Sequence, residues 1–411
     1  MVQGGRYHRQ GGAHYAVGPD ETARFADKKE GKTDKTLHPY IYSDIKTIAD
    51  HAHFRGGQWT DKDRAASDDL GGGHAHAGLL IYQGDSFPAE YRGKLFMNNI
   101  HGARINMDIP VRKGSGFVGQ HGADFLKFND PWSQVVDLRA GADGSIYMID
   151  WYDKTQCHLN AIEAHDRSNG RIYKISYGKK KVAKVDLQKL NDEELVKLLA
   201  SKNAWHARHA QRILQERYAT LAAQIHSAQG TGLEKIQRTL DSFGKPSDMT
   251  RPRLLRSDLE RTGNAKTTPQ RLRKLWTLHS AGGLSEPFAA KSLKDSDELI
   301  RAWTIQLTCE DKKPSDALLK EFARMAREDQ SPVVRLYLAS ALQRLPVAQR
   351  GEILEGLLGH AEDAQDHNLP LMYWYAAEPV AGESVASAAK LLKATKIPQV
   401  REYITRRMTA K

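Results

Sequence analysis

The feature that most constrains this chain is a change in its hydrophobic period near Lys180. Before that point, glycines separate short runs of β-branched and aromatic residues, a pattern typical of strands and turns. After it, apolar residues recur every three or four positions, a pattern typical of amphipathic helices. Residues 1–180 hold 23 of the 33 glycines. The sequence therefore predicts a β part followed by a helical part.

Six runs of the β part are expected to form strands: residues 77–82, 94–100, 104–109, 135–139, 145–150 and 170–176. The short segment at residues 101–103 and the Asp143–Gly144 pair each stand between two of these runs, where they are expected to form hairpin turns. Short strands with turns at near-regular spacing favour a β-sandwich, a barrel or a propeller. Residues 1–75 are expected to be mostly irregular.

The helical part contains a repeating pattern. Helices are expected over residues 192–200, 203–214, 268–278, 296–307, 331–342 and 368–378. Arg301 and Arg335 take equivalent positions 34 residues apart, and a related segment follows after another 35 residues. A helical repeat of this length predicts an α-solenoid of the HEAT type, in which each helix pair buries its apolar face on its neighbours.

The formal net charge of +11 is concentrated in the helical part. Residues 1–180 have 24 lysines and arginines against 22 aspartates and glutamates, whereas the remainder has 37 against 28. A solvated helical surface explains this excess, and nucleic acid is not the expected partner because no nucleic-acid-binding motif accompanies it. No uncharged apolar run approaches the roughly 18 residues of a spanning helix, so no transmembrane segment is expected.

Cysteine content and the start of the chain exclude further classes. Two cysteines rule out a disulfide scaffold, a four-cysteine zinc site and an iron–sulfur cluster. The polar start lacks the apolar core of a signal peptide. The chain is thus expected either to stay inside the cell or to lack its true N-terminus.

Histidines supply the first candidates for chemistry. His74 and His76 form a His-x-His pair at the entry to a strand, where residues two apart face the same side and can meet one ligand. His101 lies in the first predicted hairpin and could accept a proton from a hydroxyl group. Loop histidines that bond to backbone are the alternative, and no third metal ligand is identifiable, which leaves the metal unknown.

Arg104, Asp150 and Trp151 complete the candidate set. Arg104 follows the first hairpin and could stabilise an oxygen that gains negative charge. Asp150 ends a strand beside Trp151, where its carboxylate could accept hydrogen bonds from a ligand or coordinate calcium. Asp150 could equally hold neighbouring strands together by accepting backbone N–H bonds.

Four motifs resemble one family: GGGHAHAG at residues 71–78, FMNNIHGAR at 96–104, DGSIYMIDWY at 143–152 and NGRIYKIS at 169–176. Followed by HEAT-like helices, they look like the large membrane-bound dehydrogenase-like proteins of planctomycetes and verrucomicrobia. Those proteins carry a β-propeller similar to glucose/sorbosone dehydrogenases, then HEAT repeats and commonly a c-type cytochrome. The resemblance covers most of the chain.

The resemblance implies a quinone-dependent sugar or alcohol dehydrogenase that is extracytoplasmic, uses pyrroloquinoline quinone with calcium, and passes electrons to haem. It implies a catalytic role for His76, His101 and Arg104, and a role in substrate or cofactor binding for His74, Asp150 and Trp151. The domains are then a partial β-propeller over residues 1–178, a basic linker over 179–190 and a HEAT-like α-solenoid over 191–411.

The chain also departs from that family. It has strands for only two or three propeller blades, whereas about six are needed. Lys154 stands where a Cys-x-x-Cys-His motif ending in Cys157–His158 requires its first cysteine, so covalent c-type haem is excluded here. We therefore expect a fragment that is inactive or incomplete alone, with the missing blades and a cytochrome c domain or protein as partners. The alternative is a non-catalytic propeller and HEAT scaffold that binds a polysaccharide or a protein.

Overall fold

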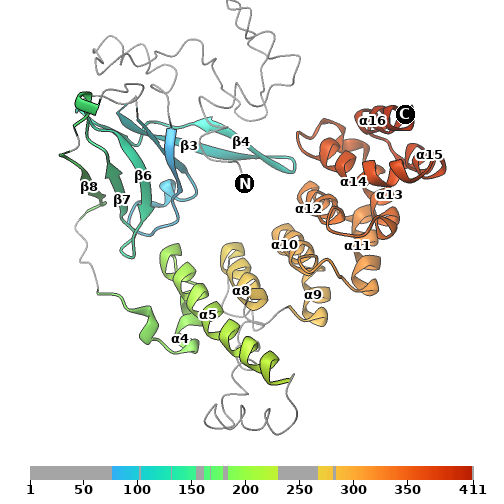
Figure 1. Ribbon diagram of the computed structural model, residues 1–411, viewed down its shortest axis with the longest axis horizontal. Coiled ribbons are helices and arrows are strands. Elements are labelled where there is room, and N and C mark those ends of the chain that lie inside the picture. Colours follow the sequence, from blue (N-terminus) through green and yellow to red (C-terminus); the bar gives the residue numbers. More distant parts are fainter. Residues whose placement is uncertain are drawn as a thin grey trace, which may run out of the picture. The chain divides into compact units, whose positions relative to one another are not determined.

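The computed structural model describes residues 76–100, 103–130, 132–153, 162–166, 168–178, 184–229, 267–280 and 284–409. The chain divides into two compact units (Figure 1). The β unit comprises Met1–Lys113, Phe117–Val185 and Lys202–Trp205, and the helical unit comprises Gly114–Gly116, Asp186–Ser201 and His206–Lys411. The main division, between Val185 and Asp186, falls within the linker predicted over residues 179–190.

The β unit contains two sheets. The first follows the order β1 (His76–Ile81), β2 (Leu95–Asn99), β3 (Arg104–Lys113) and β4 (Gly116–His121), and β5 (Leu126–Lys127) also pairs with β3. The second sheet is the antiparallel set β6 (Val135–Ala140), β7 (Ile146–Asp150) and β8 (Arg171–Ile175). All six predicted strands are confirmed. The glycine-containing β4 and the two-residue β5 were not predicted.

Strands β1 and β6 run side by side in the same direction. Near their first residues, Gly78 adopts φ +59° and a Cβ placed on it would lie only 2.7 Å from the Cα of Asp137. Beyond their last residues, the hydroxyl of Tyr82 donates to the carbonyl of Gly144 at 2.7 Å. The two sheets therefore start at the same end of the β unit, and Gly78 is required for their close approach.

One apolar core joins the two sheets. Tyr82, Phe96 and Ile105 of the first sheet and its flanks are fully buried in a cluster that also contains residues of the second sheet: Val135, Leu138, Ile146 and Met148. The buried face of the second sheet thus packs on the face of the first sheet that carries Phe96 and Ile105. Burial of this kind is the main favourable contribution to folding of the unit.

The helical unit contains eleven α-helices among its described residues. One row of helices in successive contact is formed by α8 (Thr268–Ser280), α10 (Glu298–Thr308), α12 (Pro332–Leu342), α14 (Leu369–Glu383) and α16 (Pro398–Thr409). A second row is formed by α11 (Asp316–Glu328), α13 (Gly351–Leu358) and α15 (Val385–Ala394). The remaining helices are α4 (Asp192–Leu198), α5 (Ala204–Gln229) and α9 (Glu286–Ser292).

Side chains at the helix starts explain where several helices begin. The carboxylate of Asp297 accepts from the backbone at the start of α10, and Ser315 and Ser331 do the same for α11 and α12. These caps satisfy backbone N–H groups that have no partner inside the helix. The starts of these three helices are therefore fixed by their capping side chains.

An arginine–aspartate ladder connects successive helices of the first row. Arg301 on α10 donates to both carboxylate oxygens of Asp329, at 2.8 Å each, just before α12. Arg335 on α12 makes the same paired contact with Asp363 before α14, and Arg271 on α8 contacts Asp295 before α10. Bidentate pairs of this kind fix geometry as well as adding energy. The ladder accounts for the 34-residue spacing of Arg301 and Arg335.

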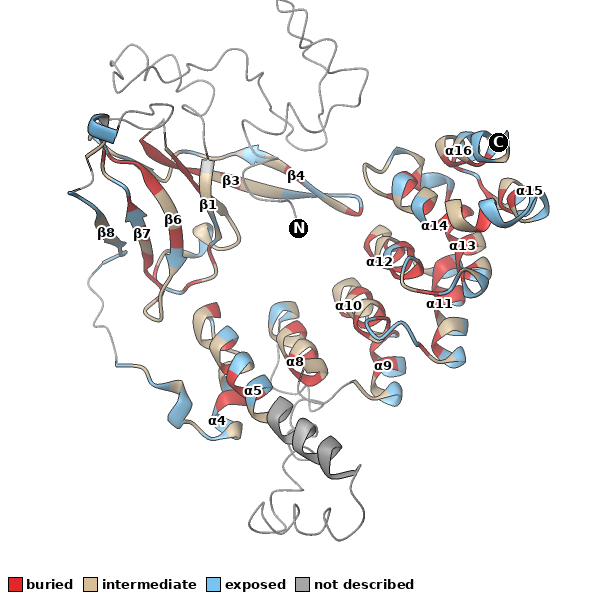
Figure 2. Ribbon diagram, in the orientation of Figure 1, coloured by how far each residue is buried: buried red, intermediate tan, exposed pale blue. Residues whose placement is uncertain are grey.

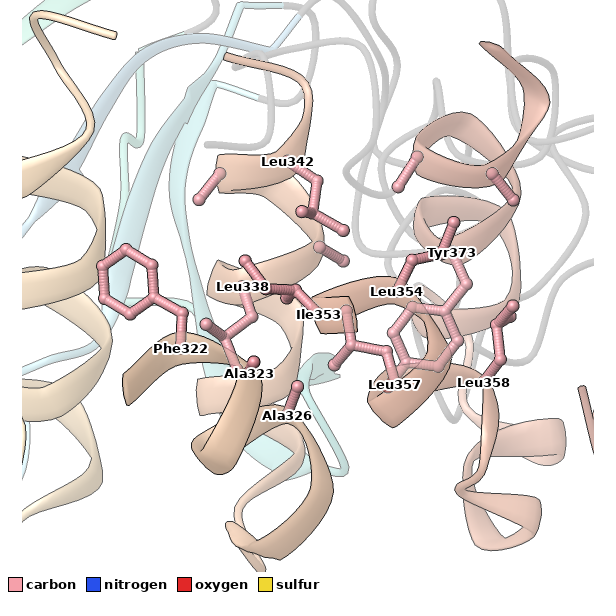
Figure 3. Packing of buried hydrophobic residues seen from close by; sticks show 14 of the residues in the cluster. Phe322, Ala323, Ala326, Leu338, Leu342, Ile353, Leu354, Leu357, Leu358 and Tyr373 are labelled. Carbon is pink, nitrogen blue, oxygen red and sulfur yellow. The ribbon is translucent and has the colours of Figure 1, made fainter. Parts of the chain in front are cut away.

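Side chains from both rows meet in one apolar core, part of which is drawn in Figure 3. Phe322 of α11, Leu338 of α12, Leu354 of α13 and Tyr373 of α14 are at most 1% exposed. Cys309 belongs to the same core. None of the helices in the described part has the length and apolarity that crossing a membrane requires.

Candidate functional site

The two sheets end in equivalent cross-strand rows at the end where β1 and β6 start. In the first sheet, the backbone of His76 pairs with Asn99, which pairs with Arg104. In the second sheet, Val135 pairs with Asp150, which pairs with Arg171. We call these the first and second strand-end rows. The register therefore brings the predicted residues His76 and Arg104 into one row, with Asn99 between them.

Arg104 belongs to a buried polar group that we call the amide–arginine cluster: Asn99, Arg104, Asn106 and Asp124. Arg104 Nη1 donates to Asp124 Oδ2 at 2.8 Å, and Asn106 Nδ2 donates to Asp124 Oδ1 at 2.6 Å. Asn99 Nδ2 in turn donates to Asn106 Oδ1 at 3.0 Å. Arg104 is only 1% exposed, so its charge depends on this carboxylate. The chain of donors fixes the orientation of both amides.

The turn before Arg104 has a special backbone conformation. Ala103, between the predicted residues His101 and Arg104, adopts φ 45°, which is uncommon for a residue with a Cβ. Its carbonyl accepts from the N–H of Phe128 at 2.9 Å, and Ala103 is 5% exposed. Such conformations persist only where the surroundings hold them, and they are concentrated at ligand sites.

In the second strand-end row, the carboxylate of Asp150 accepts hydrogen bonds from three neighbouring residues. Asp150 accepts from the backbone N–H of Gln134 at 2.7 Å, from Ser133 Oγ at 3.1 Å and from Arg171 Nη2 at 2.8 Å. Burial opposes the charge on Arg171, but its bonds to Asp150 dominate and raise the pKa of the guanidinium above its ordinary value. The backbone-binding role considered for Asp150 is therefore present in the structure.

Aromatic rings lie beside the second row. The guanidinium of Arg171 stacks 3.4 Å from the centre of the Tyr152 ring, and the rings of Tyr152 and Trp132 are 5.6 Å apart. Trp132 and Trp151 are 38% and 42% exposed. Exposed aromatic rings offer a flat apolar surface to a ligand. Trp151 directly follows β7, at the end of the second sheet, and its binding role stays a prediction.

Two of the predicted residues, His74 and His101, lie outside the described residues, and for His76 the structure describes only the backbone. Arg104 and Asp150 lie in different sheets and at different positions of their strand-end rows, since Arg104 starts β3 whereas Asp150 ends β7. The two residues are therefore not cross-strand partners of each other.

The amide and guanidinium groups of the amide–arginine cluster are of the kind that bonds hydroxyl groups, and Asn99, Asn106 and Arg104 are at most 1% exposed. An amide both donates and accepts hydrogen bonds, and a guanidinium offers five donors in one plane. Calcium suits the second row less well, because Asp150 Oδ2 already lies 2.8 Å from the positive charge of Arg171. Within the described ranges, no three His, Cys, Asp or Glu side chains form a group that could hold a metal ion.

Sequence reasoning missed Asn99, Asn106 and Asp124, and it missed Arg171 as the partner of Asp150. One signal was available: Arg104–Ile105 and Arg171–Ile172 each begin the third strand of a sheet. When Arg104 is aligned with Arg171, Asn99 and Asp150 are equivalent, because each is the cross-strand partner of the aligned arginine. Asp124 had no such signal, because it reaches the cluster from the loop before β5.

A family model described as "Domain of unknown function (DUF7133)" matches residues 8–179. The match covers less than half of the chain, and it contains both sheets and all six predicted site residues. A comparison with curated proteins found no match for this chain.

Proposed function

We propose that this chain is part of a sugar or alcohol dehydrogenase-like protein of the glucose/sorbosone type, and that its β unit supplies part of the substrate site. The observation that carries the proposal is the first strand-end row, which aligns His76 with Asn99 and Arg104 of the amide–arginine cluster. Three neighbouring residues of different hydrogen-bonding character suit recognition of a hydroxyl-bearing carbon.

In this proposal the residues have distinct roles. Asn99 and Arg104 orient the substrate through its hydroxyl groups, while Asp124 holds Arg104 in place. His76 takes the proton of the hydroxyl group that is oxidised. Trp151, at the end of the second sheet, contributes an aromatic surface to the same substrate.

The arrangement of the sheets supports a propeller-type architecture as part of the proposal. Two antiparallel sheets stand face against face, with their first strands parallel and in contact, as neighbouring propeller blades do. The helical unit, with its two rows and its arginine–aspartate ladder, is proposed to be a HEAT-type scaffold. The remaining blades and a cytochrome c domain or protein are the proposed partners, in an extracytoplasmic compartment.

Pyrroloquinoline quinone and calcium enter the proposal through the family resemblance alone. Among the described residues, both row arginines are already engaged by carboxylates, Arg104 by Asp124 and Arg171 by Asp150. Neither therefore offers a charge that a quinone carboxylate could use without displacing its partner. We accordingly assign no quinone or calcium ligand within the described part of the chain.

The test is calorimetric titration of the full chain with pyrroloquinoline quinone and calcium, followed by dye-coupled oxidation of sugars and alcohols. Saturable binding that His76→Ala weakens, and that the control His279→Ala leaves unchanged, supports the proposal. His279 is a suitable control because it pairs with Glu310 in the helical unit. Binding without His76 dependence contradicts the proposed site, and absence of both binding and turnover contradicts the dehydrogenase function for this chain alone.

A non-catalytic scaffold for a polysaccharide or protein is the second candidate. It is favoured by the exposed rings of Trp132 and Trp151 and by the carboxylates that already pair with both row arginines. A scaffold would bind a polysaccharide without any oxidation of it. Affinity electrophoresis in gels that contain polysaccharide, with Trp132→Ala as the variant, distinguishes this function from the first.

A further inference from the structure

The sequence contains a single Asn–Gly pair, Asn169–Gly170, and the structure places it at the surface. Residues 168–170, which lead into β8, are all exposed (Figure 2). A Cβ built on Gly170 would meet nothing within 4 Å, so the backbone here is open to solvent. Because glycine has no Cβ, the peptide between the two residues can rotate at little steric cost.

The side chain of Asn169 belongs to a small polar turn, the Asp166 turn, formed by Asp166, Ser168 and Asn169. Asn169 Nδ2 donates to Asp166 Oδ2 at 2.9 Å and to Ser168 Oγ at 3.2 Å. Asp166 Oδ1 accepts from the backbone N–H of Ser168 at 2.9 Å and from its hydroxyl at 2.6 Å. Both bonds of the Asn169 side chain are thus donated by its amide nitrogen, which a carboxylate at this position would lack.

A second turn of the β unit has the same glycine but is closed. The carboxylate of Asp143 is 5% exposed and contacts Lys174 at 2.6 Å. The N–H of Gly144 donates to the carbonyl of Gly141 at 3.0 Å, and a Cβ built on Gly144 would lie 2.8 Å from the backbone nitrogen of Ser86. A turn that is held in this way cannot rotate so that a side-chain carbonyl meets the next backbone nitrogen, whereas nothing within 4 Å encloses Gly170.

We propose that Asn169–Gly170 is a site of spontaneous deamidation. The backbone nitrogen of Gly170 forms a bond to Cγ of Asn169, and the bond from Cγ to Nδ2 breaks. The proton of the Gly170 nitrogen goes to the departing group, which leaves as ammonia, and a five-membered succinimide ring remains.

Water opens this ring in one of two ways. Attack at Cγ breaks the bond from Cγ to the Gly170 nitrogen and gives aspartate. Attack at the main-chain carbonyl carbon of residue 169 breaks the other bond to that nitrogen and gives isoaspartate, in which the chain continues through Cγ. Water is the only co-reactant, and no group is oxidised or reduced.

The product changes the entry to β8. A carboxylate at position 169 stands where an amide now donates to Asp166, so two like charges face each other. Isoaspartate also adds a methylene group to the main chain close before Arg171, whose guanidinium contacts Asp150 at 2.8 Å. Deamidation therefore loosens the second strand-end row as the protein ages.

The experiment is incubation of the full chain at mildly alkaline pH over several weeks, followed by mass spectrometry of its peptides. We expect the peptide that contains Asn169 to shift to the deamidated mass, with isoaspartate detected by enzymatic methylation. Asn191 is the internal control, because it is exposed but caps α4 and is followed by Asp192. Its peptide should keep the mass of the amide.

Gly170→Ala is the matched variant, because its methyl group has room in the folded protein but hinders closure of the ring. It should abolish most of the conversion over the same period. An unchanged Asn169 in the wild type, or equal conversion in the wild type and Gly170→Ala, would overturn the proposal. Equal conversion of Asn169 and Asn191 would overturn it as well.

Asn169→Asp tests the structural consequence without incubation. We expect faster hydrogen exchange at the β8 amides than in the wild type, since the variant replaces the donor to Asp166 by a carboxylate. Exchange at α10, in the helical unit, should stay unchanged. Identical exchange of β8 in the variant and the wild type would contradict the loosening of the second strand-end row.

Discussion

The two strand-end rows differ in the residue that pairs with the arginine, and this difference decides how each arginine is held. In the second row the residue beside Arg171 is a carboxylate, Asp150, and the ion pair forms within the row. In the first row the residue beside Arg104 is an amide, Asn99, so the counter-charge comes from Asp124 in a separate loop. The second row thus contains the carboxylate that pairs with its arginine, whereas the first row depends on a carboxylate from outside the row.

Removing the separate carboxylate should have the largest effect on this comparison. Asp124→Ala removes the carboxylate that accepts from Arg104 at 2.8 Å and from Asn106 at 2.6 Å. We expect the β unit to lose about 4 kcal/mol of stability, which is typical of breaking a buried pair. Hydrogen exchange of the β2 and β3 amides would measure the loss separately from the helical unit. Lys127→Ala is the control, and it should cost less than about 1 kcal/mol because Lys127 is half exposed and lies 3.9 Å from Asp124.

The close approach of β1 and β6 depends on Gly78. Gly78→Ala would place a methyl group against the backbone of Asp137 at a position with φ +59°. We expect a loss of about 3 kcal/mol, from the left-handed conformation and the overpacking together. The control is Gly170→Ala, since a Cβ at Gly170 meets nothing within 4 Å. If the two variants melted at the same temperature, the packing of β1 on β6 would not depend on this contact.

Making the second row resemble the first tests the comparison directly. Asp150→Asn keeps an acceptor for the backbone N–H of Gln134 but removes the charge that faces Arg171. We expect a loss of about 2 kcal/mol, because Arg171 is one-third exposed and also contacts Asp130. Urea denaturation followed by exchange at β7 would measure it. A loss as large as that of Asp124→Ala would mean that the two rows are equally dependent on their carboxylates.

The smallest expected effect is a loss of stability at low pH. Burial alone would raise the pKa of Asp143, but its bonds with Lys174 and Ser145 lower that pKa below the ordinary 3.8. The turn between β6 and β7 therefore gains stability that is complete above about pH 4 and is lost as the pH falls through the lowered pKa. Denaturation midpoints of the wild type and Asp143→Asn should differ at pH 7, and the difference should become smaller at pH 3. A constant difference would contradict the role of this carboxylate.

Local patterns predicted much of the fold. Strands β1, β2, β3, β6, β7 and β8 follow from runs of β-branched and aromatic residues, and the 34-residue spacing of Arg301 and Arg335 anticipated the ladder. β4 and β5 were not predicted, because glycines interrupt β4 and because β5 has only two residues. Strand periodicity reflects burial of alternate residues, and it says little where neither face is apolar.

The site was less predictable, for a physical reason. Asp150 and Arg104 could be found because each stands at a strand end beside a turn. Asp124 contributes only through a contact between a loop and a strand, and such contacts leave no period in the sequence. The alignment of His76 with Arg104 required the register of three strands, which depends on the whole sheet.

Cys309 gives the helical unit a built-in reporter. Its thiol is completely buried in the main core of that unit, and burial raises its pKa to about 11. Only the thiolate reacts readily with alkylating reagents, so in the closed unit this sulfur is chemically silent at neutral pH. Cys309 therefore reacts only when the helix rows open. In a Cys157→Ser background, the rate of alkylation measures how often the helical unit opens.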